Sequence, residues 1–108
     1  MGIKEIEVAT GNKLLIRELE DVCDSVTGRA LTGSWIWDPA VVLSNWISAR
    51  AQLGYDLSSK TVFELGAGTG LPGLTAARLG ASRGVLTDIT PLIPVLVQNV
   101  EVNGRSAQ

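Results

Sequence analysis

The sequence predicts an α/β fold whose parallel sheet is incomplete within these 108 residues. Two observations carry this prediction. From residue 60 onward, short apolar runs alternate with helical patterns, which is typical of parallel strands joined by helices. Three glycines, Gly66, Gly68 and Gly70, follow the first of these runs in the stretch "FELGAGTGLPG". Glycine is costly inside regular structure, so the cluster indicates a sharp turn between a strand and a helix.

The elements of the second half are predicted from short sequence signals. The β-rich runs "KTVFEL", residues 60–65, and "GVLTDI", residues 84–89, predict two strands, and "LPGLTAARLG" between them predicts a helix that ends at Gly80. "PLIPVLVQNVEVNG" predicts a further helix, in which Pro94 should distort or delay the first turn. Because only two parallel strands are predicted, the sheet should keep an open edge.

The first part of the chain predicts a β-hairpin followed by a loop. Ile6 and Val8 alternate with charged residues, and "TGNK" supplies turn chemistry, so residues 3–19 favour a hairpin. The stretch "KLLIRELEDV" is also compatible with a short helix. Residues 22–34 carry Ser, Thr and Gly without periodicity and are expected to form a loop.

A helix is predicted within "WIWDPAVVLSNWISARAQLGYD". Asp38 is expected to be its N-cap, because a carboxylate before Pro39 at the first helical position is a strong helix start. Apolar residues then recur at helical spacing, and Gly54 is placed to end the helix. Trp46 lies within this segment and is expected to be an ordinary core residue.

The composition excludes several classes of function. A net charge of -2 gives no reason to expect nucleic acid as a partner. No apolar run is long enough to span a bilayer, and "MGIKEIEV" has no signal-peptide core. With no histidine and one cysteine, neither a usual zinc site nor a Ser-His-Asp mechanism can be built, and we expect no metal. The lone Cys23 fits a reducing compartment, so we expect a cytoplasmic protein.

The glycine turn and an acidic residue beyond it indicate a nucleotide-like cofactor. A glycine-rich turn at the start of a helix lets backbone N–H groups approach a ligand closely. Asp88 ends the next strand, where nucleotide-binding α/β folds hold ribose hydroxyls. The alternative is that Asp88 caps the following helix, a role also open to Thr90. Leu71 stands where the dinucleotide fingerprint has its third glycine, which disfavours a nicotinamide cofactor.

Three segments carry a resemblance to a known family. "ELGAGTGLPG", followed by "TDI", resembles the first two motifs of class I S-adenosylmethionine-dependent methyltransferases. "TGSWIWDPAVVLSNWI" is similar to the "V-W-D-A-A-x-x-L" segment of the methyltransferase-like protein-lysine methyltransferases, with Pro39 in place of an alanine. "LVQNVEVN" resembles the next helix of that family, with Asn99 and Asn103 at its recurrent asparagines.

The resemblance implies a fold and a division of the chain. Residues 1–31 would be an N-terminal β-hairpin extension and loop, and residues 32–108 would be the first half of a Rossmann-like domain that binds S-adenosylmethionine. The fold would then be the N-terminal part of a class I methyltransferase, truncated before the sheet is complete.

The resemblance also implies roles for individual residues. Six of them are expected to bind or position S-adenosylmethionine: Trp37, Glu64, Gly66, Gly68, Gly70 and Asp88. Glu64 would orient the glycine turn, and Asp88 would hold the ribose hydroxyls. Trp37 would pack near the cofactor, with an ordinary core position as its alternative. No catalytic residue is assigned.

The function implied by the resemblance is methylation of lysine in a protein substrate. The family's adenine-flanking strand and its Asp-x-x-Tyr segment have no counterpart in these residues, so the 108-residue chain alone is expected to be inactive. A second hypothesis is a non-catalytic cofactor-binding or regulatory module that associates with a partner chain through the open sheet edge. A dinucleotide oxidoreductase is a third hypothesis, disfavoured by the glycine spacing.

Overall fold

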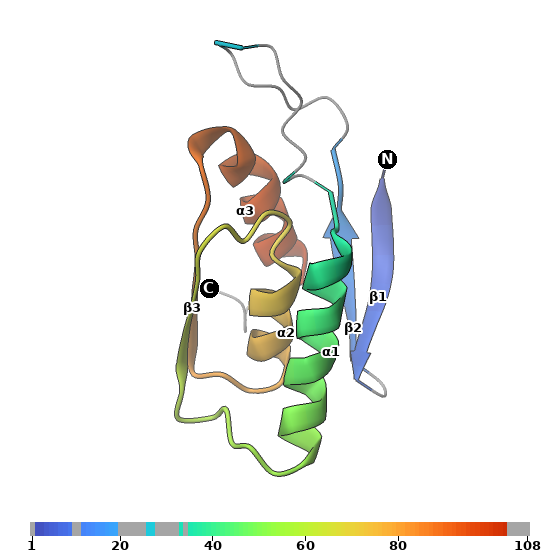
Figure 1. The fold of residues 1–108 in the computed structure, drawn as a ribbon, viewed down its shortest axis with the longest axis vertical. Helices are drawn as coiled ribbons and strands as arrows, with labels where there is room; N and C mark the ends of the chain where they lie inside the picture. Colours follow the sequence, from blue (N-terminus) through green and yellow to red (C-terminus); the bar gives the residue numbers. More distant parts are fainter. Residues whose placement is uncertain (1, 10–11, 20–25, 28–32, 34, 104–108) are drawn as a thin grey trace.

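A computed structural model describes residues 2–9, 12–19, 26–27, 33 and 35–103. Its helices form a central layer between two separate two-stranded sheets (Figure 1). The elements in chain order are β1 (Ile3–Ala9), β2 (Asn12–Arg17), α1 (Asp38–Gln52), β3 (Thr61–Glu64), α2 (Leu71–Arg78), β4 (Arg83–Leu86), the short 3₁₀ helix η2 (Thr90–Leu92) and α3 (Ile93–Val102).

β3 and β4 form the parallel pair that the sequence predicts. Their register runs from Thr61 opposite Arg83 to Glu64 opposite Leu86. Each strand is shorter than its apolar run: β3 ends at Glu64, before the glycine turn, and β4 ends at Leu86, so Asp88 lies just beyond the strand that it was expected to end. The helices cover one side of this pair (Figure 1). The parallel pairing confirms the predicted strand–helix–strand order.

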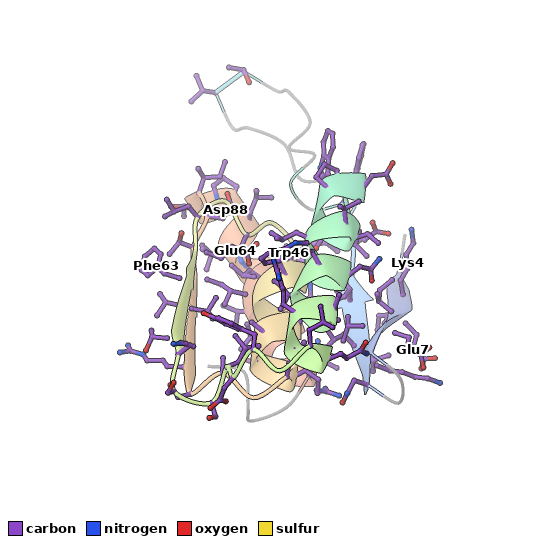
Figure 2. The ribbon with its side chains drawn as sticks, turned by 60° about the horizontal axis from the view of Figure 1, so that its bottom comes forward. Lys4, Glu7, Trp46, Phe63, Glu64 and Asp88 are labelled. Carbon is purple, nitrogen blue, oxygen red and sulfur yellow. The ribbon has the colours of Figure 1, made fainter. Side chains whose placement is uncertain are left out.

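The other side of the β3–β4 sheet is open in the described part of the chain, and no described strand pairs with either of its outer edges. Figure 2 shows Phe63 pointing away from the helices, and its side chain is 62% exposed. The carbonyls of Lys60 and Glu64 accept hydrogen bonds from Ser82 and Thr87 on the β4 side. Backbone groups alternate in direction along a strand, so those of Phe63 point to the opposite edge, with which no described strand pairs.

β1 and β2 pair antiparallel within the segment for which the sequence predicts a hairpin. The register runs from Ile3 opposite Arg17 to Glu7 opposite Lys13, with an irregularity before Ala9. The predicted turn residues 10–11 and most of the predicted loop over 22–34 lie outside the described residues. One face of the pair is apolar and buried, and it packs with α2 in a single core cluster: Val8, Leu14, Ile16, Leu71 and Leu74.

Helix α1 begins one residue away from the predicted capping arrangement. Trp37 is the N-cap, with extended backbone angles (φ -92°, ψ 150°), and its carbonyl accepts a hydrogen bond from the Ala40 N–H at 3.0 Å. The prediction that Asp38 is the N-cap is therefore wrong, and no described side chain caps this helix. Asp38 instead takes a helical conformation in the first turn, where its charge still favours the helix N-terminus. Gly54 follows the helix with φ +99°, which confirms the predicted stop.

The face that α1 turns inward is lined with small residues. Ser44 and Ser48 are buried, and their hydroxyls donate to the backbone carbonyls of Ala40 and Val8, respectively. These side chains allow a close approach between α1, α2 and β1. Trp46 lies on a different face and is 55% exposed, so the prediction that it belongs to the core is wrong.

The glycine and proline residues near the ends of the later helices have the effects that the sequence predicts. Gly80, with φ +110°, comes directly after the last turn of α2, as predicted. Residues Thr90–Leu92 form a 3₁₀ turn, and the α-helix begins only at Ile93, with Pro94 in its first turn. Pro94 lacks an N–H and is tolerated there, which confirms the predicted delay. None of the described helices has the length and apolar character needed to cross a membrane.

Candidate cofactor site

Most residues expected to bind a cofactor meet around one cavity of about 510 Å³. The cavity lies where the start of α1, the turn after β3 and the end of β4 come together. The predicted residues among its lining are Trp37, Glu64, Gly66, Gly68 and Asp88. Figure 2 shows Glu64 and Asp88 near each other at one end of the β3–β4 sheet. The carboxyl ends of parallel strands are where α/β folds bind ligands.

The glycine turn needs glycine at Gly66 and Gly68 for different reasons. Both residues have positive φ angles, +64° and +59°, which side chains disfavour. A Cβ at Gly66 would meet no described atom within 4 Å, and Gly66 lines the cavity, so the open space lies beside its backbone. A Cβ at Gly68 would lie 2.6 Å from the carbonyl oxygen of Gly33. Gly66 therefore borders open space in the cavity, and Gly68 lets the segment before α1 pack closely on the turn.

Gly70 is packed closely against neighbouring side chains. It is the N-cap of α2 with φ +92°. It is not among the described residues that line the cavity. A Cβ at Gly70 would lie 2.8 Å from a methyl of Leu96 and 3.1 Å from one of Leu86. Its glycine character is explained by this close packing of α3 and β4 on the start of α2.

Asp88 holds the glycine turn from the end of β4. Its Oδ2 accepts a hydrogen bond from the Gly68 N–H at 2.7 Å, and its Oδ1 accepts one from the Ile89 N–H at 2.7 Å. No described side chain caps η2 or α3, so neither Asp88 nor Thr90 has the capping role considered as an alternative. A carboxylate oxygen has more than one acceptor direction, so Asp88 can accept from a ligand hydroxyl as well.

Glu64 connects β3 to the first turn of α2. Its Oε1 accepts a hydrogen bond from the Gly73 N–H at 3.0 Å. Burial raises the pKa of Glu64 to about 7, an effect that the Gly73 hydrogen bond opposes and the nearby Asp88 charge reinforces. Near neutral pH, Glu64 is therefore partly protonated, in contrast to an exposed glutamate.

The stability of the protein is expected to depend on pH through Glu64. Between its ordinary pKa of 4.5 and about 7, folded Glu64 keeps a proton that the unfolded chain has released. Its stabilising contribution is full below 4.5 and is lost as pH rises through about 7. Allowing for solvent around a half-buried group, Glu64→Gln should gain roughly 1–2 kcal/mol relative to wild type between about pH 5 and about pH 8. Urea denaturation of both proteins at each pH measures this difference, and a pH-independent difference would contradict it.

The segment before α1 is held by the two residues that follow β2, Glu18 and Leu19. The Ile36 N–H donates to Oε2 of the buried Glu18 at 2.6 Å, and the Trp35 Nε1–H donates to the Leu19 carbonyl at 3.0 Å. Burial raises the pKa of Glu18, but the Ile36 hydrogen bond and Lys4, 3.0 Å away, outweigh that effect and hold the pKa below its ordinary value. These contacts fix the position of the segment that contains Trp37, which forms one wall of the cavity. Trp37 itself is 53% exposed and so is not a core residue.

Several lining residues were not predicted from the sequence. Most of them lie within the segments that carry the family resemblance, although no role was expected of them there: Gly33, Trp35, Leu43, Thr69, Pro72 and Leu92. Thr69 and Pro72 adjoin the glycines, and Leu43 lies about one helical turn beyond Pro39, so a wider reading of the motifs would have found them. Gly33 lies in the segment that begins "TGSW", but that segment gave no reason to expect its contact with the turn, and Leu92 has no local signal.

The lining suits a ligand with hydroxyl groups and an apolar part. The lining includes the carboxylates Glu64 and Asp88 and the indole rings of Trp35 and Trp37. Carboxylates accept from ribose hydroxyls and attract a cationic centre, and indole rings pack against flat or cationic groups. The volume of about 510 Å³ lies within the range typical of cofactor sites. The residues present therefore fit S-adenosylmethionine.

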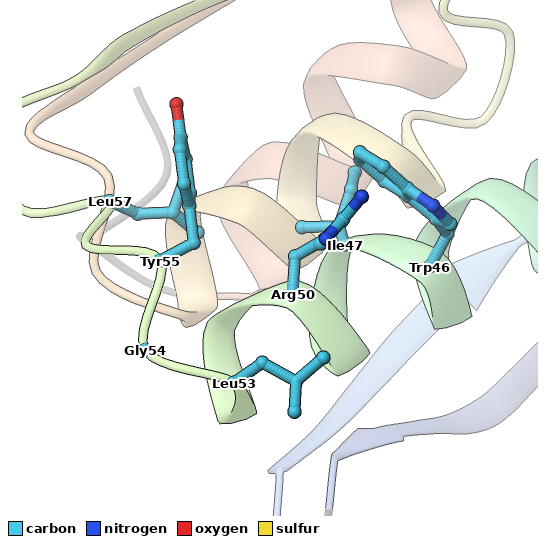
Figure 3. Close-up of a pocket in the computed structure, with 7 residues that line it drawn as sticks. All are labelled: Trp46, Ile47, Arg50, Leu53, Gly54, Tyr55 and Leu57. Carbon is cyan, nitrogen blue, oxygen red and sulfur yellow. The ribbon is translucent and has the colours of Figure 1, made fainter.

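A second groove, of about 590 Å³, lies at the other end of α1 (Figure 3). It is formed by the last turns of α1 and the segment up to Leu57, and the Arg50 guanidinium lies 5.0 Å from the centre of the Trp46 ring. Although larger, this groove includes neither the glycine turn nor the carboxylates among its described lining. Of these two cavities, only the smaller one has the glycine turn and both carboxylates among its described lining residues.

Comparison with known proteins shows which family this chain resembles. A family model described as lysine methyltransferase matches residues 12–108. Protein N-lysine methyltransferase METTL21A of Danio rerio is 46% identical over 68 residues, which cover 63% of this chain and 29% of that relative. Protein-lysine methyltransferase METTL21E of Mus musculus is 37% identical over 78 residues, covering 72% and 31%, respectively. Protein N-terminal and lysine N-methyltransferase efm7 of Neurospora crassa is 31% identical over 84 residues, covering 75% and 29%.

These matches extend over most of the present chain but over a small part of its relatives. The chain spans about three tenths of the length of the curated relatives that it matches. The family model, in contrast, matches almost the whole of the chain and includes the glycine turn, Asp88 and the segment from Trp35 to Pro39. The chain belongs to the lysine methyltransferase family.

Proposed function

We propose that the cavity between α1, the glycine turn and the end of β4 binds S-adenosylmethionine. The observation that supports this most is that segments far apart in the sequence meet there, each with a residue expected at such a site. Trp37 comes from the start of α1, Gly66 and Gly68 come from the turn, and Asp88 comes from the end of β4. Asp88 would accept from the ribose hydroxyls, and Gly66 would leave room for the cofactor beside the backbone.

The parallel unit of β3, α2 and β4 would be the start of a Rossmann-like domain. In this proposal the domain covers residues 32–108, and residues 1–31 form the hairpin extension and loop. The parallel register of β3 with β4 and the site at their carboxyl ends support it. The apolar face of the β1–β2 pair shares a core with α2, so the extension would be an integral part of the folded unit. A cytoplasmic location fits the lone Cys23.

The whole protein would transfer a methyl group to lysine in a protein substrate. Bound S-adenosylmethionine would supply an electrophilic methyl group on a sulfonium centre. Residues of this chain would bind and orient that donor, with Glu64 and Gly73 fixing the start of α2 and Asp88 fixing the turn. Such transfer depends mainly on positioning, which can contribute roughly 7–11 kcal/mol. The groups that would aim the lysine are not among the residues that the resemblance assigns here, so the 108 residues alone should show no detectable turnover.

A transfer assay tests this function. A hybrid would join residues 1–103 to the corresponding remainder of the Danio rerio relative, and it would be incubated with a labelled methyl donor and cell extract beside the 108-residue chain. We expect the hybrid to label lysine in protein, and the 108-residue chain and the Asp88→Ala hybrid to give little or no labelling. Labelling of nucleic acid or small molecules alone, or no labelling by the hybrid, would contradict protein-lysine methylation. Labelling by the 108-residue chain would contradict its expected inactivity.

A second candidate is a non-catalytic cofactor-binding or regulatory module that acts through a partner chain. The observation that favours it is the open side of the β3–β4 sheet, where Phe63 and Leu65 are largely exposed beside a strand edge that no described strand covers. This hypothesis expects Phe63→Lys to abolish association while leaving cofactor binding unchanged. Light scattering over a range of concentrations, with and without the substitution, separates it from a monomeric enzyme domain.

A further inference from the structure

We propose that Asn99 is a positioning residue that ties the edge of β2 to the glycine turn, so that the β1–β2 pair helps to shape the cofactor cavity. This inference rests on the proposed cofactor function of that cavity. Asn99 does not line the cavity among the described residues and would not contact the cofactor. Its effect would pass through the carbonyl of Thr69, which does belong to the lining.

Asn99 in α3 and Asn103, the C-cap of that helix, pair with the edge of β2 as a neighbouring strand would. The Asn99 Oδ1 accepts from the Arg17 N–H at 2.7 Å, and its Nδ2 donates to the Arg17 carbonyl at 3.1 Å. Asn103 makes the same pair of contacts with Leu15, at 2.8 and 2.9 Å. Leu15 and Arg17 are two positions apart, so their backbone groups point to the same edge. Residues four apart on α3 share one face of the helix, which explains the matching spacing.

The two asparagines differ in their remaining contact. The second Nδ2 hydrogen of Asn99 points to the Thr69 carbonyl, at 2.9 Å, in the glycine turn. The corresponding donor of Asn103 goes to the Asn99 carbonyl, at 2.7 Å, within α3 itself. Asn99 is fully buried, and its amide is satisfied by β2 on one side and by the turn on the other. Both residues therefore hold the β2 edge, but only Asn99 also holds the turn.

The contact to Thr69 fixes the orientation of one peptide group. The carbonyl of the peptide between Thr69 and Gly70 is held by Asn99, and its N–H donates to the Ala67 carbonyl at 2.8 Å. Gly68 and Gly70 flank this region with positive φ angles, and glycines give the backbone freedom to rotate. Without Asn99, the Thr69 carbonyl would lose its buried partner, and the peptide would turn toward another one. The wall of the cavity at Thr69 would then change.

A matched pair of variants tests the proposal. Asn99→Leu and Asn103→Leu each remove the two hydrogen bonds to β2, with side chains of similar size, and only the former removes the contact to Thr69. We expect both to lower stability, whereas only Asn99→Leu shifts the amide signals of Thr69 and Gly70 in nuclear magnetic resonance spectra. Binding of S-adenosylhomocysteine by the folded fraction should weaken about three- to tenfold for Asn99→Leu and less than about twofold for Asn103→Leu.

Serine substitutions at the same two positions provide a second test that perturbs the packing less. If the leucine variants fail to fold, Asn99→Ser and Asn103→Ser provide the same comparison with less crowding, and the same contrast is expected. Equal effects of the two positions on affinity and on the Thr69 and Gly70 signals, or no effect of either, would overturn the positioning role. If the wild-type chain fails to bind S-adenosylhomocysteine, the proposed cofactor function fails, and the amide signals alone still decide whether Asn99 positions the turn.

Discussion

Gly68→Ala is expected to lower the free energy of unfolding by roughly 2–5 kcal/mol. Part of this cost comes from placing a side chain at φ +59°. The larger part comes from the new Cβ, which would lie 2.6 Å from the Gly33 carbonyl oxygen, a backbone atom that cannot rotate away. The segment before α1 would have to move off the glycine turn. Because Gly33 and Gly68 both line the cavity, this movement should also abolish cofactor binding.

Gly66→Ala is the matched control for this prediction. Its φ of +64° is nearly the same, so the conformational cost should be similar, about 1–2 kcal/mol. Its Cβ would meet no described atom within 4 Å, so no clash is added. Urea denaturation of the two variants isolates the clash as the difference between them. Equal destabilisation by the two substitutions would contradict the close packing of Gly33 on the turn.

Asp88→Ala is expected to weaken binding of S-adenosylhomocysteine by roughly ten- to a hundredfold. A hydrogen bond to a charged group contributes about 1.5–3 kcal/mol, which corresponds to that range. The substitution would remove the proposed acceptor for the ribose hydroxyls and would also release the N–H groups of Gly68 and Ile89. Isothermal titration calorimetry or a spectroscopic titration measures the change.

Thr90→Ala serves as the control for the Asp88 prediction. Thr90 was the other candidate for capping the next helix, and it lies in η2 without a capping contact among the described residues. We expect this variant to bind the cofactor as wild type does. If Asp88→Ala folds normally and its affinity is unchanged, Asp88 does not hold the cofactor.

The sequence was informative wherever local chemistry determines local structure. Gly54 and Gly80 ended helices because the residue after a helix often needs a positive φ angle. Pro94 delayed α3 because it lacks a backbone donor. The glycine cluster and Asp88 were placed at the ends of neighbouring strands by the strand–helix–strand pattern alone. These signals were sufficient to bring most of the predicted site residues together.

The sequence was uninformative where distant segments meet. The contact of Asn99 with Arg17 spans 82 positions, and no periodicity indicates that a helical amide pairs with a strand edge. The requirement for glycine at Gly68 comes from its contact with Gly33, which lies 35 positions earlier in the sequence. Trp46 was assigned to the core by its apolar character, but the helix turns its serine face inward instead. Tertiary packing decides these cases, and local propensity does not record it.

Binding of cofactor at the glycine turn is the central claim, and amide signals measured during a titration test it most directly. S-adenosylhomocysteine and NAD would each be added to the labelled wild-type chain, because chemical shifts detect even weak binding. We predict saturable shifts with S-adenosylhomocysteine at Gly66, Gly68 and the Trp37 indole, and no comparable shifts with NAD. Preferential binding of NAD, or shifts confined to the groove around Trp46 and Tyr55, would contradict the assignment of this cavity.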